Sequence, residues 1–581
     1  TNVHDNEADY GGGVCFEGGP SVVISASSVD GNTSYESGGG MYLSATDSIQ
    51  LTGNTIEGNV AAGSGAGAFI SNDDGSIELI DNIIQSNDAT GSGGGAFIRT
   101  YYQGSIVLTN NTITGNSAIA ISSGGGFFLY ANGAITVIGN TIQNNDAIQG
   151  NGGGLCVNDG SPTSICLQDN DFLGNSASLG GGCYIYVSSG SMRIEGNTVL
   201  SNVAGDSGGG MYFNDYSDEL PADSFEGNTF IGNYAIGKLL STGGAVFFGG
   251  SGAGSTVSEC FFTGNTTREA GGAIYSATPC TILSCTFNGN GTAVLSKGGA
   301  VGLSNASLIR NCLFIHNVAE SGGGVHLMHL PENADIVNCT FVDNTAVSGI
   351  DDHGGGAIMC HDYGPSCPTA YIRNCIFRQN SAPPGRGASI AAIAIDWPRY
   401  ETKASLSYSC LPGVGADELV QLGEGVIIQG SGIIQEDPLF AHGVDYQHPE
   451  LEDFHLKCRF GRWADTESGG EWVYTDTQIS PCIDAGDPAD GRSSEPYWNG
   501  NRVNMGGYGN TGQASPSGWQ IPGDADLNCH VNILDLIFIR NHMGKVHGGE
   551  DYIVFADVNS DNTINILDLI FVRNKLNTEC D

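Results

Sequence analysis

Apolar residues come in short runs over the first two thirds of the chain, and a glycine cluster precedes each run. Met41–Leu43, Phe127–Leu129 and Met211–Phe213 are such runs, in which β-prone residues are bounded by residues typical of turns. Most clusters are 27 or 28 residues apart, which predicts short strands joined by tight corners. The clusters begin at Gly11, Gly38, Gly65, Gly93, Gly124, Gly152, Gly180, Gly208, Gly243, Gly271, Gly298, Gly322 and Gly354.

Every repeat also carries an asparagine three residues after an apolar residue, as in Ile56 and Asn59 or Phe172 and Asn175. Asparagine tolerates left-handed backbone angles, and its amide both donates and accepts, so stacked copies can bond along an axis. The positions are Asn6, Asn32, Asn59, Asn87, Asn116, Asn145, Asn175, Asn202, Asn233, Asn265, Asn290, Asn317, Asn344 and Asn380.

These two signals predict a stack of coils. One repeat cannot bury its own apolar face, so each strand must pair in parallel with the next coil at about 4.8 Å. Fourteen coils would make a parallel β-helix roughly 65 Å long. A leucine-rich repeat also uses an asparagine ladder, but the leucine spacing of that fold is missing. We expect a mainly β protein with a β-helix over residues 1–445, whose coils loosen after Ala382.

A second column lies five residues before the first and changes from asparagine to cysteine midway. Parallel stacked side chains do not automatically meet the disulfide dihedral of about 90°. Stacked thiols are therefore favoured, while a zipper of disulfides or a metal site stays open. The column comprises Asn54, Asn82, Asn111, Asn140, Asn170, Asn197 and Asn228, then Cys260, Cys285, Cys312, Cys339 and Cys375.

The paired motifs resemble those of known surface proteins. Gly243–Val246, Gly271–Ile274 and Gly298–Val301, with Phe230 to Asn233 beside them, are similar to the repeats of chlamydial polymorphic outer-membrane proteins and of bacterial surface β-helices. The resemblance covers roughly residues 1–380 and implies a right-handed, pectate-lyase-like β-helix with an adhesive or carbohydrate-contacting role. The chain starts inside a coil, so we also expect self-association through an uncapped first coil.

Residues 446–514 are expected to be an irregular end of the β-helix with an insertion. Ser480–Pro488 and Met505–Thr511 resemble the terminal segment of bacterial surface β-helices. The insertion between Cys458 and Cys482 holds Trp463 and Trp472, and we expect a disulfide to close it. Cys360 with Cys367 is the second expected pair.

After a linker over residues 515–523, residues 524–581 contain two nearly identical twelve-residue loops that begin at Asp524 and Asp557. Positions 1, 3, 5, 9 and 12 are Asp or Asn in both copies, which supplies the oxygen ligands that calcium prefers. Position 7 would add a backbone carbonyl, and each loop enters a helix, Leu536 to His542 or Leu569 to Leu576. The predicted ligands of two calcium ions are Asp524, Asp526, Asn528, His530, Asn532 and Asp535, then Asp557, Asn559, Asp561, Thr563, Asn565 and Asp568.

This module resembles a type I-like dockerin, which implies docking onto a cohesin domain. The partner-facing positions would be Ile533, Leu534 and Arg540, repeated as Ile566, Leu567 and Arg573. Ile-Leu pairs differ from the Ser-Thr pairs of cellulosomal dockerins, so a cellulosome is not expected. The sixth loop position, usually glycine, is Cys529 or Asn562, and we expect Cys529 to bond to Cys580. A calcium-stabilised cap without a cohesin is the alternative.

Charge and cysteine content restrict the possible binding partners and the cellular compartment. The chain has 20 basic and 62 acidic side chains, a formal net charge of −42, which disfavours nucleic acid and anionic lipid. No run of 18 apolar residues occurs, so membrane insertion is not expected. Seventeen cysteines in a chain rich in small polar residues indicate an oxidising, extracellular or cell-surface location.

Catalytic residues are harder to find. Of the motifs of a polygalacturonase, only the pair Asp351 and Asp352 occurs. His329 and His361 both follow the first glycine of a cluster by seven residues, so they are expected to stack on adjacent coils as acid, base or metal ligands. Asp351, Asp352, His353 and Asp362 are expected nearby. A solvated polar face explains the same residues. We therefore expect a structural, adhesive or glycan-binding rod, possibly a fibre subunit; the alternative is a polysaccharide lyase or hydrolase attached to a scaffold.

Overall fold

The structure of the 581-residue chain is a computed structural model. It describes residues 1–158, 161–217, 223–237, 241–292, 297–305, 307–328, 332–350, 353–362, 369–394, 402–412, 418–423, 425–466, 469–496, 499–518, 523–526, 528, 530–547, 549, 551–559 and 561–578, without the side chains of residues 292, 362, 393, 394 and 423.

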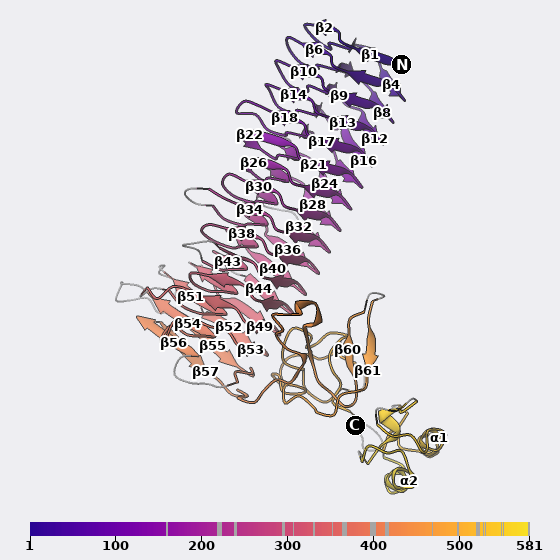
Figure 1. The fold of residues 1–581 in the computed structure, drawn as a ribbon, viewed down its shortest axis with the longest axis vertical. Coiled ribbons are helices and arrows are strands. Elements are labelled where there is room, and N and C mark those ends of the chain that lie inside the picture. Colours follow the sequence, from indigo (N-terminus) through magenta and orange to yellow (C-terminus); the bar gives the residue numbers. More distant parts are fainter. Residues whose placement is uncertain are drawn as a thin grey trace.

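Four parallel sheets run along a rod (Figure 1). The first coil contributes β1 (Asn2–His4), β2 (Glu7–Ala8), β3 (Val14–Glu17) and β4 (Ser21–Ser25), and every later coil adds one strand to each sheet. The sheets hold 14, 13, 15 and 15 strands, and they end at β53 (Ile376–Arg378), β50 (Thr345–Ala346), β56 (Leu419–Gly423) and β57 (Val426–Gln429). The parallel β-helix predicted from the repeat is confirmed.

The core lies inside the coils because strand residues alternate between inward and outward positions. β8 (Ser48–Thr52), for example, buries Ile49 and Leu51 and leaves its other residues half-buried. Register between coils is constant, so equivalent residues stack. Phe287 and Phe314 stack with ring centroids 4.8 Å apart at an angle of 5° between the rings.

The asparagine ladder is continuous from Asn6 to Asn380, because the asparagine of each coil hydrogen-bonds to that of the next. The backbone and side-chain amides of Asn145 both donate to Asn175 Oδ1 at 3.0 Å, and the side-chain amide also donates to the Ile113 carbonyl. These bonds satisfy buried backbone groups at a corner where no sheet can do so.

The cysteine part of the second column, from Cys260 to Cys375, consists of free thiols without disulfides. Each thiol donates to a backbone carbonyl two residues earlier, at 3.2 Å for Cys285 and 3.3 Å for Cys339. All five cysteines of the column are buried and free, so of the three alternatives the structure has stacked thiols.

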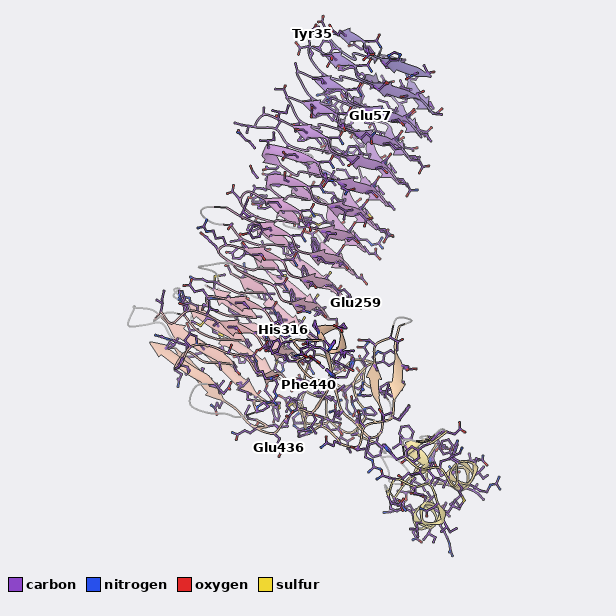
Figure 2. The ribbon with its side chains drawn as sticks, in the orientation of Figure 1. Tyr35, Glu57, Glu259, His316, Glu436 and Phe440 are labelled. Carbon is purple, nitrogen blue, oxygen red and sulfur yellow. The ribbon has the colours of Figure 1, made fainter. Side chains whose placement is uncertain are left out.

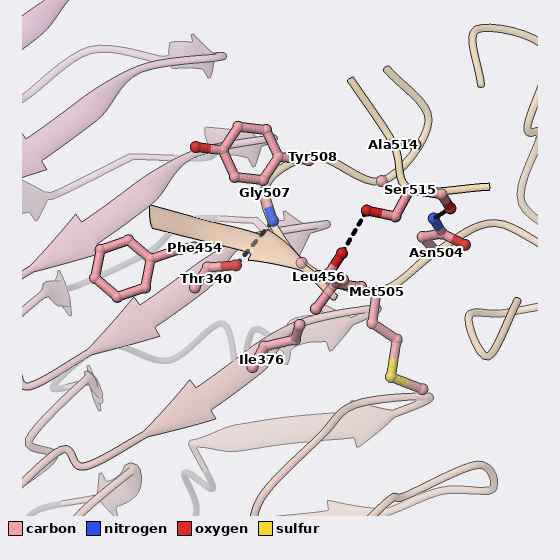
Figure 3. Close-up of a pocket in the computed structure, with 12 residues that line it drawn as sticks. Thr340, Ile376, Phe454, Leu456, Asn504, Met505, Gly507, Tyr508, Ala514 and Ser515 are labelled. Atoms are coloured by element: carbon pink, nitrogen blue, oxygen red, sulfur yellow. Dashed lines mark hydrogen bonds between the residues drawn. The ribbon is translucent and has the colours of Figure 1, made fainter. Parts of the chain in front are cut away.

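After the last coil the chain folds back along the side of the rod (Figure 1). This C-terminal segment contains β58 (Phe440–His442), β59 (Asp453–Leu456), β60 (Arg462–Ala464) and β61 (Glu471–Val473). Gly507 donates its backbone amide to Thr340 Oγ1 at 2.9 Å, and the Ser515 hydroxyl donates to the Leu456 carbonyl (Figure 3).

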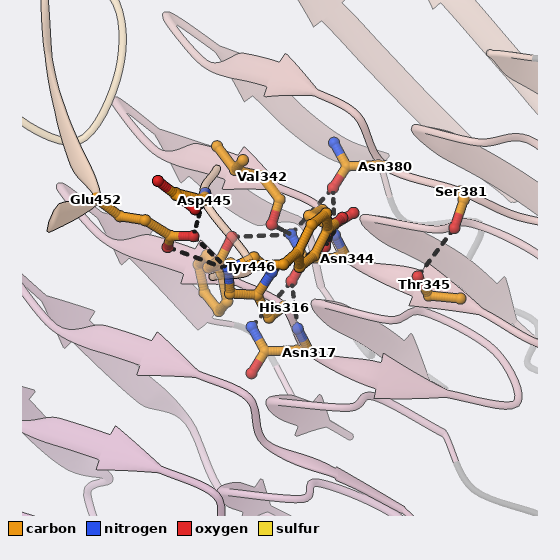
Figure 4. Close-up of polar contacts among 12 residues, drawn as sticks. His316, Asn317, Val342, Asn344, Thr345, Asn380, Ser381, Asp445, Tyr446 and Glu452 are labelled. Atoms are coloured by element: carbon orange, nitrogen blue, oxygen red, sulfur yellow. Dashed lines mark hydrogen bonds and ion pairs between the residues drawn. The ribbon is translucent and has the colours of Figure 1, made fainter. Parts of the chain in front are cut away.

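His316 fixes the first part of this segment. Its Nδ1 lies 2.8 Å from Asp343 of the next coil, and its Nε2 lies 3.0 Å from Glu452 (Figure 4). The Tyr446 hydroxyl donates to the same Asp343 at 2.7 Å. The segment is thus held on the rod by charged and polar contacts as well as by an apolar interface.

Two expected disulfides are wrong. Cys458 and Cys482 are both buried and free, and the Cys458 thiol donates to the Pro516 carbonyl at 2.7 Å. The Cys482 thiol instead contacts the Cys410 thiol. Cys360 points into the core and is also free, while Cys367 lies outside the described residues.

Candidate functional site

The terminal domain contains two helices, α1 (Ile533–Asn541) and α2 (Ile566–Arg573), each preceded by one of the acidic loops. Both helices begin with a capping box. The Asn532 side chain accepts from the backbone amide of Leu534, and Asp535 accepts from the Asn532 amide at 2.8 Å. Asn565 and Asp568 repeat this arrangement. The last acidic residue of each loop therefore caps the helix that follows it.

The first loop gathers carboxylates around one point. Oxygen atoms of Asp524, Asp526 and Asp535 all lie within 4.8 Å of one another. Asp524 and Asp535 are buried, and Asp526 Oδ1 has no hydrogen-bond partner among the described residues. Burial and the two neighbouring carboxylates raise the pKa of Asp526 to about 6. A cation would offset the mutual repulsion of these carboxylates, and carboxylate, amide and carbonyl oxygens fit calcium.

The second loop has the same internal bonds. The Asp557 carboxylate accepts from the backbone amides of Asp561 and Asn562, and Asp568 accepts from Asn559 at 3.1 Å. Burial raises the pKa of Asp568, which like Asp557 is fully buried. Asn562, at the sixth position, has a φ of 69°, the left-handed angle for which glycine is usual there. Its counterpart Cys529, and Cys580, lie outside the described residues.

The remaining predicted ligands lie on the same loops. The Asn532 side chain donates to the His530 carbonyl, and the Asn565 side chain donates to the Thr563 carbonyl, both at 2.9 Å. Asn528 and Asp561 each accept from the backbone amide two residues later. Each twelve-residue loop is thus folded around its own acidic residues.

The predicted partner-facing residues form two exposed apolar pairs. Ile533 and Leu534 at the start of α1 are 67% and 52% exposed, and Ile566 and Leu567 at the start of α2 are 57% and 52% exposed. Arg540 and Arg573 lie seven residues after the first isoleucine of each pair, which places them on the same helix face.

The domain also rests against the C-terminal segment of the β-helix. Phe555 packs on Tyr474 with ring centroids 6.1 Å apart, and Val554 belongs to the same apolar cluster. Arg459 of the segment reaches to 3.8 Å from the Asp557 carboxylate. The contact lies away from the exposed Ile-Leu pairs, which the interface leaves accessible.

The predicted histidine pair is corrected by the register. His361, in β51 (Ile358–Asp362), pairs with Met328 of β47 (Val325–Met328), so His329 is not its equivalent. The imidazole beside His361 is that of His326, with ring centroids 5.6 Å apart and both rings buried. Burial, His361 and Lys297 hold the pKa of His326 well below its usual range. A buried imidazole pair that a polymer cannot reach makes a poor acid–base site.

The other members of the predicted acid–base set cannot be placed beside this pair. His329, Asp351 and Asp352 lie outside the described residues, as does the side chain of Asp362. Asp362 itself continues the strand that carries His361.

A cleft that sequence reasoning missed lies between the rod and the C-terminal segment, with a volume of about 680 Å³. Its floor includes Glu259, Phe261 and Thr286 of successive coils, and its roof includes Asp465 and Tyr508. Glu259 lies where the segment begins to cover the rod (Figure 2). The one local signal was a glutamate, at a φ of 53°, in a corner position that most other coils fill with Gly, Asn, Asp or Ser and that Ala26 and Tyr408 occupy near the two ends of the rod.

Comparison with known proteins agrees with both parts of the fold. Neither a curated protein nor a solved structure matches the chain. Residues 522–577 match the dockerin type I domain. Dockerin type I domains bind calcium, typically bind cohesin on scaffold proteins, and occur in extracellular or cell-surface proteins. No helix among the described residues is both long and apolar enough to cross a membrane. Residues 1–98, 64–250 and 185–377 match the right handed beta helix region, and the chain belongs to that family.

Proposed function

We propose that this protein is an extracellular rod that its dockerin attaches to a cohesin-bearing scaffold, and that the rod binds polysaccharide. The observation that supports attachment through the dockerin is that its two acidic loops have the same hydrogen-bond geometry. In both loops the last Asp accepts from the backbone amides of positions 3 and 9, so both loops present the same oxygen-lined turn. We therefore assign one calcium ion to each loop, with the twelve predicted residues as ligands.

The exposed Ile-Leu pairs support a protein partner. Single exposed apolar residues are common, but a repeated pair at the start of two helices in so small a domain forms an apolar surface that water does not favour. The domain keeps its own core separately, around Ile539 and Val572. A cohesin that covers one or both pairs explains why these positions are apolar. Ile-Leu pairs are also the reason to expect a scaffold other than that of a cellulosome.

The role of the rod is binding and not cleavage in this proposal. The basic groups that would neutralise a uronate are scarce, with 20 Lys and Arg in the whole chain. The described histidines that lie together are buried and face each other. Head-to-tail association through the first coil stays a prediction.

The experiment that tests attachment uses the full chain, a panel of cohesin modules immobilised on a biosensor, and buffer with calcium or with a chelator. We expect calcium-dependent capture by at least one cohesin, lost when Ile533, Leu534, Ile566 and Leu567 are all changed to Ala. Ile231→Ala, on an exposed rod position, is the matched control and should bind normally. Capture that persists in the four-residue variant, or capture in chelator, would show that the dockerin surface does not dock in this way.

A further inference from the structure

The cleft between the rod and the C-terminal segment is built differently from the rest of the rod surface. Its floor crosses four consecutive coils at their corner positions, Gly227, Glu259, Ser284 and Asn311. Because coils repeat at about 4.8 Å, the floor is an elongated surface parallel to the rod axis. A linear polymer can lie along such a surface, whereas a compact ligand would use only part of it.

The roof is fixed in place by hydrogen bonds and packing. Asn311 donates its side-chain amide to the Gly507 carbonyl at 3.1 Å, and Gly507 donates to Thr340. Tyr508 is stacked on the buried His455 with ring centroids 3.6 Å apart. A site that is already formed loses little conformational entropy when a ligand binds.

The floor offers one flat apolar surface. Phe261, in β37 (Phe261–Thr263), is 54% exposed and pairs in register with Thr229 on one side and Thr286 on the other. An aromatic ring flanked by hydroxyl groups is suited to a ligand with an apolar ring face and a polar edge, which is the chemistry of a pyranose. Phe262, the next residue, points into the core, so the exposed ring is not needed for packing there.

Glu259 occupies a strained backbone position beside this ring. Its φ is 53°, while the equivalent corners on either side carry Gly227 and Ser284. Left-handed angles are unfavourable for a residue such as glutamate, and strain of this kind clusters at binding and catalytic sites. The Glu259 side chain is exposed and lines the cleft, so the side chain and not the backbone accounts for this residue choice.

The charges of the cleft select the class of ligand. Glu259 and Asp465 are its charged lining residues, and no Lys or Arg lines it among the described residues. Asp465 is oriented by the Trp463 indole, which donates to it at 3.0 Å. Carboxylates accept hydrogen bonds from hydroxyl groups but repel uronates and sulfated sugars.

We infer that this cleft binds a stretch of neutral polysaccharide, with Phe261 as the platform for a sugar ring and Glu259 and Asp465 as acceptors for its hydroxyl groups. The inference rests on the proposed function and adds the place and the class of glycan. It does not require the polymer to be cleaved.

The test is affinity electrophoresis and calorimetry of the full chain with soluble xylan, mannan and mixed-linkage glucan as neutral probes, and polygalacturonate and alginate as anionic ones. We expect one neutral polymer to bind, Phe261→Ala to weaken it by about tenfold or more, and Ile83→Ala to leave it unchanged. Ile83 is a matched control, since it occupies the equivalent outward position several coils away and is 41% exposed.

Glu259→Gly separates binding from stability. Glycine relieves the backbone at φ 53°, so this variant should melt at a higher temperature and yet bind the glycan less tightly. If wild-type protein binds no polysaccharide, the rod part of the proposed function fails. If it binds but Phe261→Ala and Glu259→Gly bind equally well, or if only an anionic polymer binds, the site inferred here is wrong and the proposed function stands.

Discussion

The Asp535 carboxylate accepts a hydrogen bond from the backbone amide of Asp526, with 3.0 Å between the oxygen and the nitrogen. Its second oxygen accepts from the Asn532 amide at 2.8 Å. The last residue of the loop thus holds the third and ninth positions and caps α1 as well. Asp568 repeats both bonds in the second loop. Each closing aspartate therefore joins the predicted calcium loop to the start of a helix.

Replacement of either closing aspartate should weaken calcium binding and destabilise the domain together. Asp535→Ala removes a carboxylate of the predicted site and one half of a capping box, so we expect a calcium affinity lower by roughly tenfold or more and a loss of about 1 kcal/mol in cap stability. Calcium titration followed by thermal unfolding of the full chain measures both. Asp551→Asn, which removes the exposed charge that pairs with Lys545 but tolerates the φ of 62° at this position, is the control and should change neither.

The asparagine ladder should be costly to interrupt. Asn145→Ala leaves the buried amides of Asn116 without their acceptor and the Ile113 carbonyl without its donor, so we expect a loss of about 2 kcal/mol. Thr112→Ala, an exposed change on a neighbouring coil, is the comparison. Equal melting temperatures for the two variants would show that the ladder bonds do not stabilise the rod.

His326 should make stability depend on pH. Its folded-state pKa lies below the ordinary value, so between that pKa and about 6.5 the unfolded chain binds a proton that the folded chain does not. Stability is therefore lost as pH falls below about 6.5. Asp223 and Glu495, whose pKa values burial raises to about 7, act in the opposite direction.

The contribution of His326 is isolated by the difference between wild type and His326→Gln in thermal unfolding at several pH values. We expect the melting temperature of the variant to rise relative to that of wild type as pH falls from 7.5 to 5. A difference that stays constant over this range would mean that the pKa of His326 in the folded protein is the same as in the unfolded chain.

The thiol contacts predict which cysteines an oxidant can join. Cys482 contacts Cys410, whereas Cys458 donates to a carbonyl. Treatment with a disulfide such as oxidised glutathione should therefore cross-link Cys410 to Cys482, with two molecules of reduced glutathione released. Cys458 should stay available for alkylation after unfolding. Peptide mapping without reductant would reveal a Cys458–Cys482 bond if this assignment is wrong.

The repeat was predictable because each coil needs the same local chemistry. Asn59 bonds to its neighbour in the next coil, and Gly38 has a φ of 74° that other residues avoid, so sequence and structure repeat together. The loops that begin at Asp524 and Asp557 were predictable for the same reason, since their ligand residues are close in sequence.

The errors came from places where counting along the sequence does not give the position in space. The glycine with positive φ in the His361 coil is Gly355 and not Gly354, so counting from the first glycine shifted the register by one residue. Cys482 meets Cys410 because the C-terminal segment folds back onto the rod. The cleft joins Glu259 to Asp465 in the same way, and no local pattern encodes such a meeting.

The most direct test of the account is the number of calcium ions that the chelator-treated full-length protein binds in isothermal titration calorimetry. The duplicated loops predict saturable binding of two ions per chain, with one ion lost in Asp535→Ala and one in Asp568→Ala. Absence of saturable binding, or full binding in both variants, would contradict the assignment of these loops as the calcium sites through which the rod is attached.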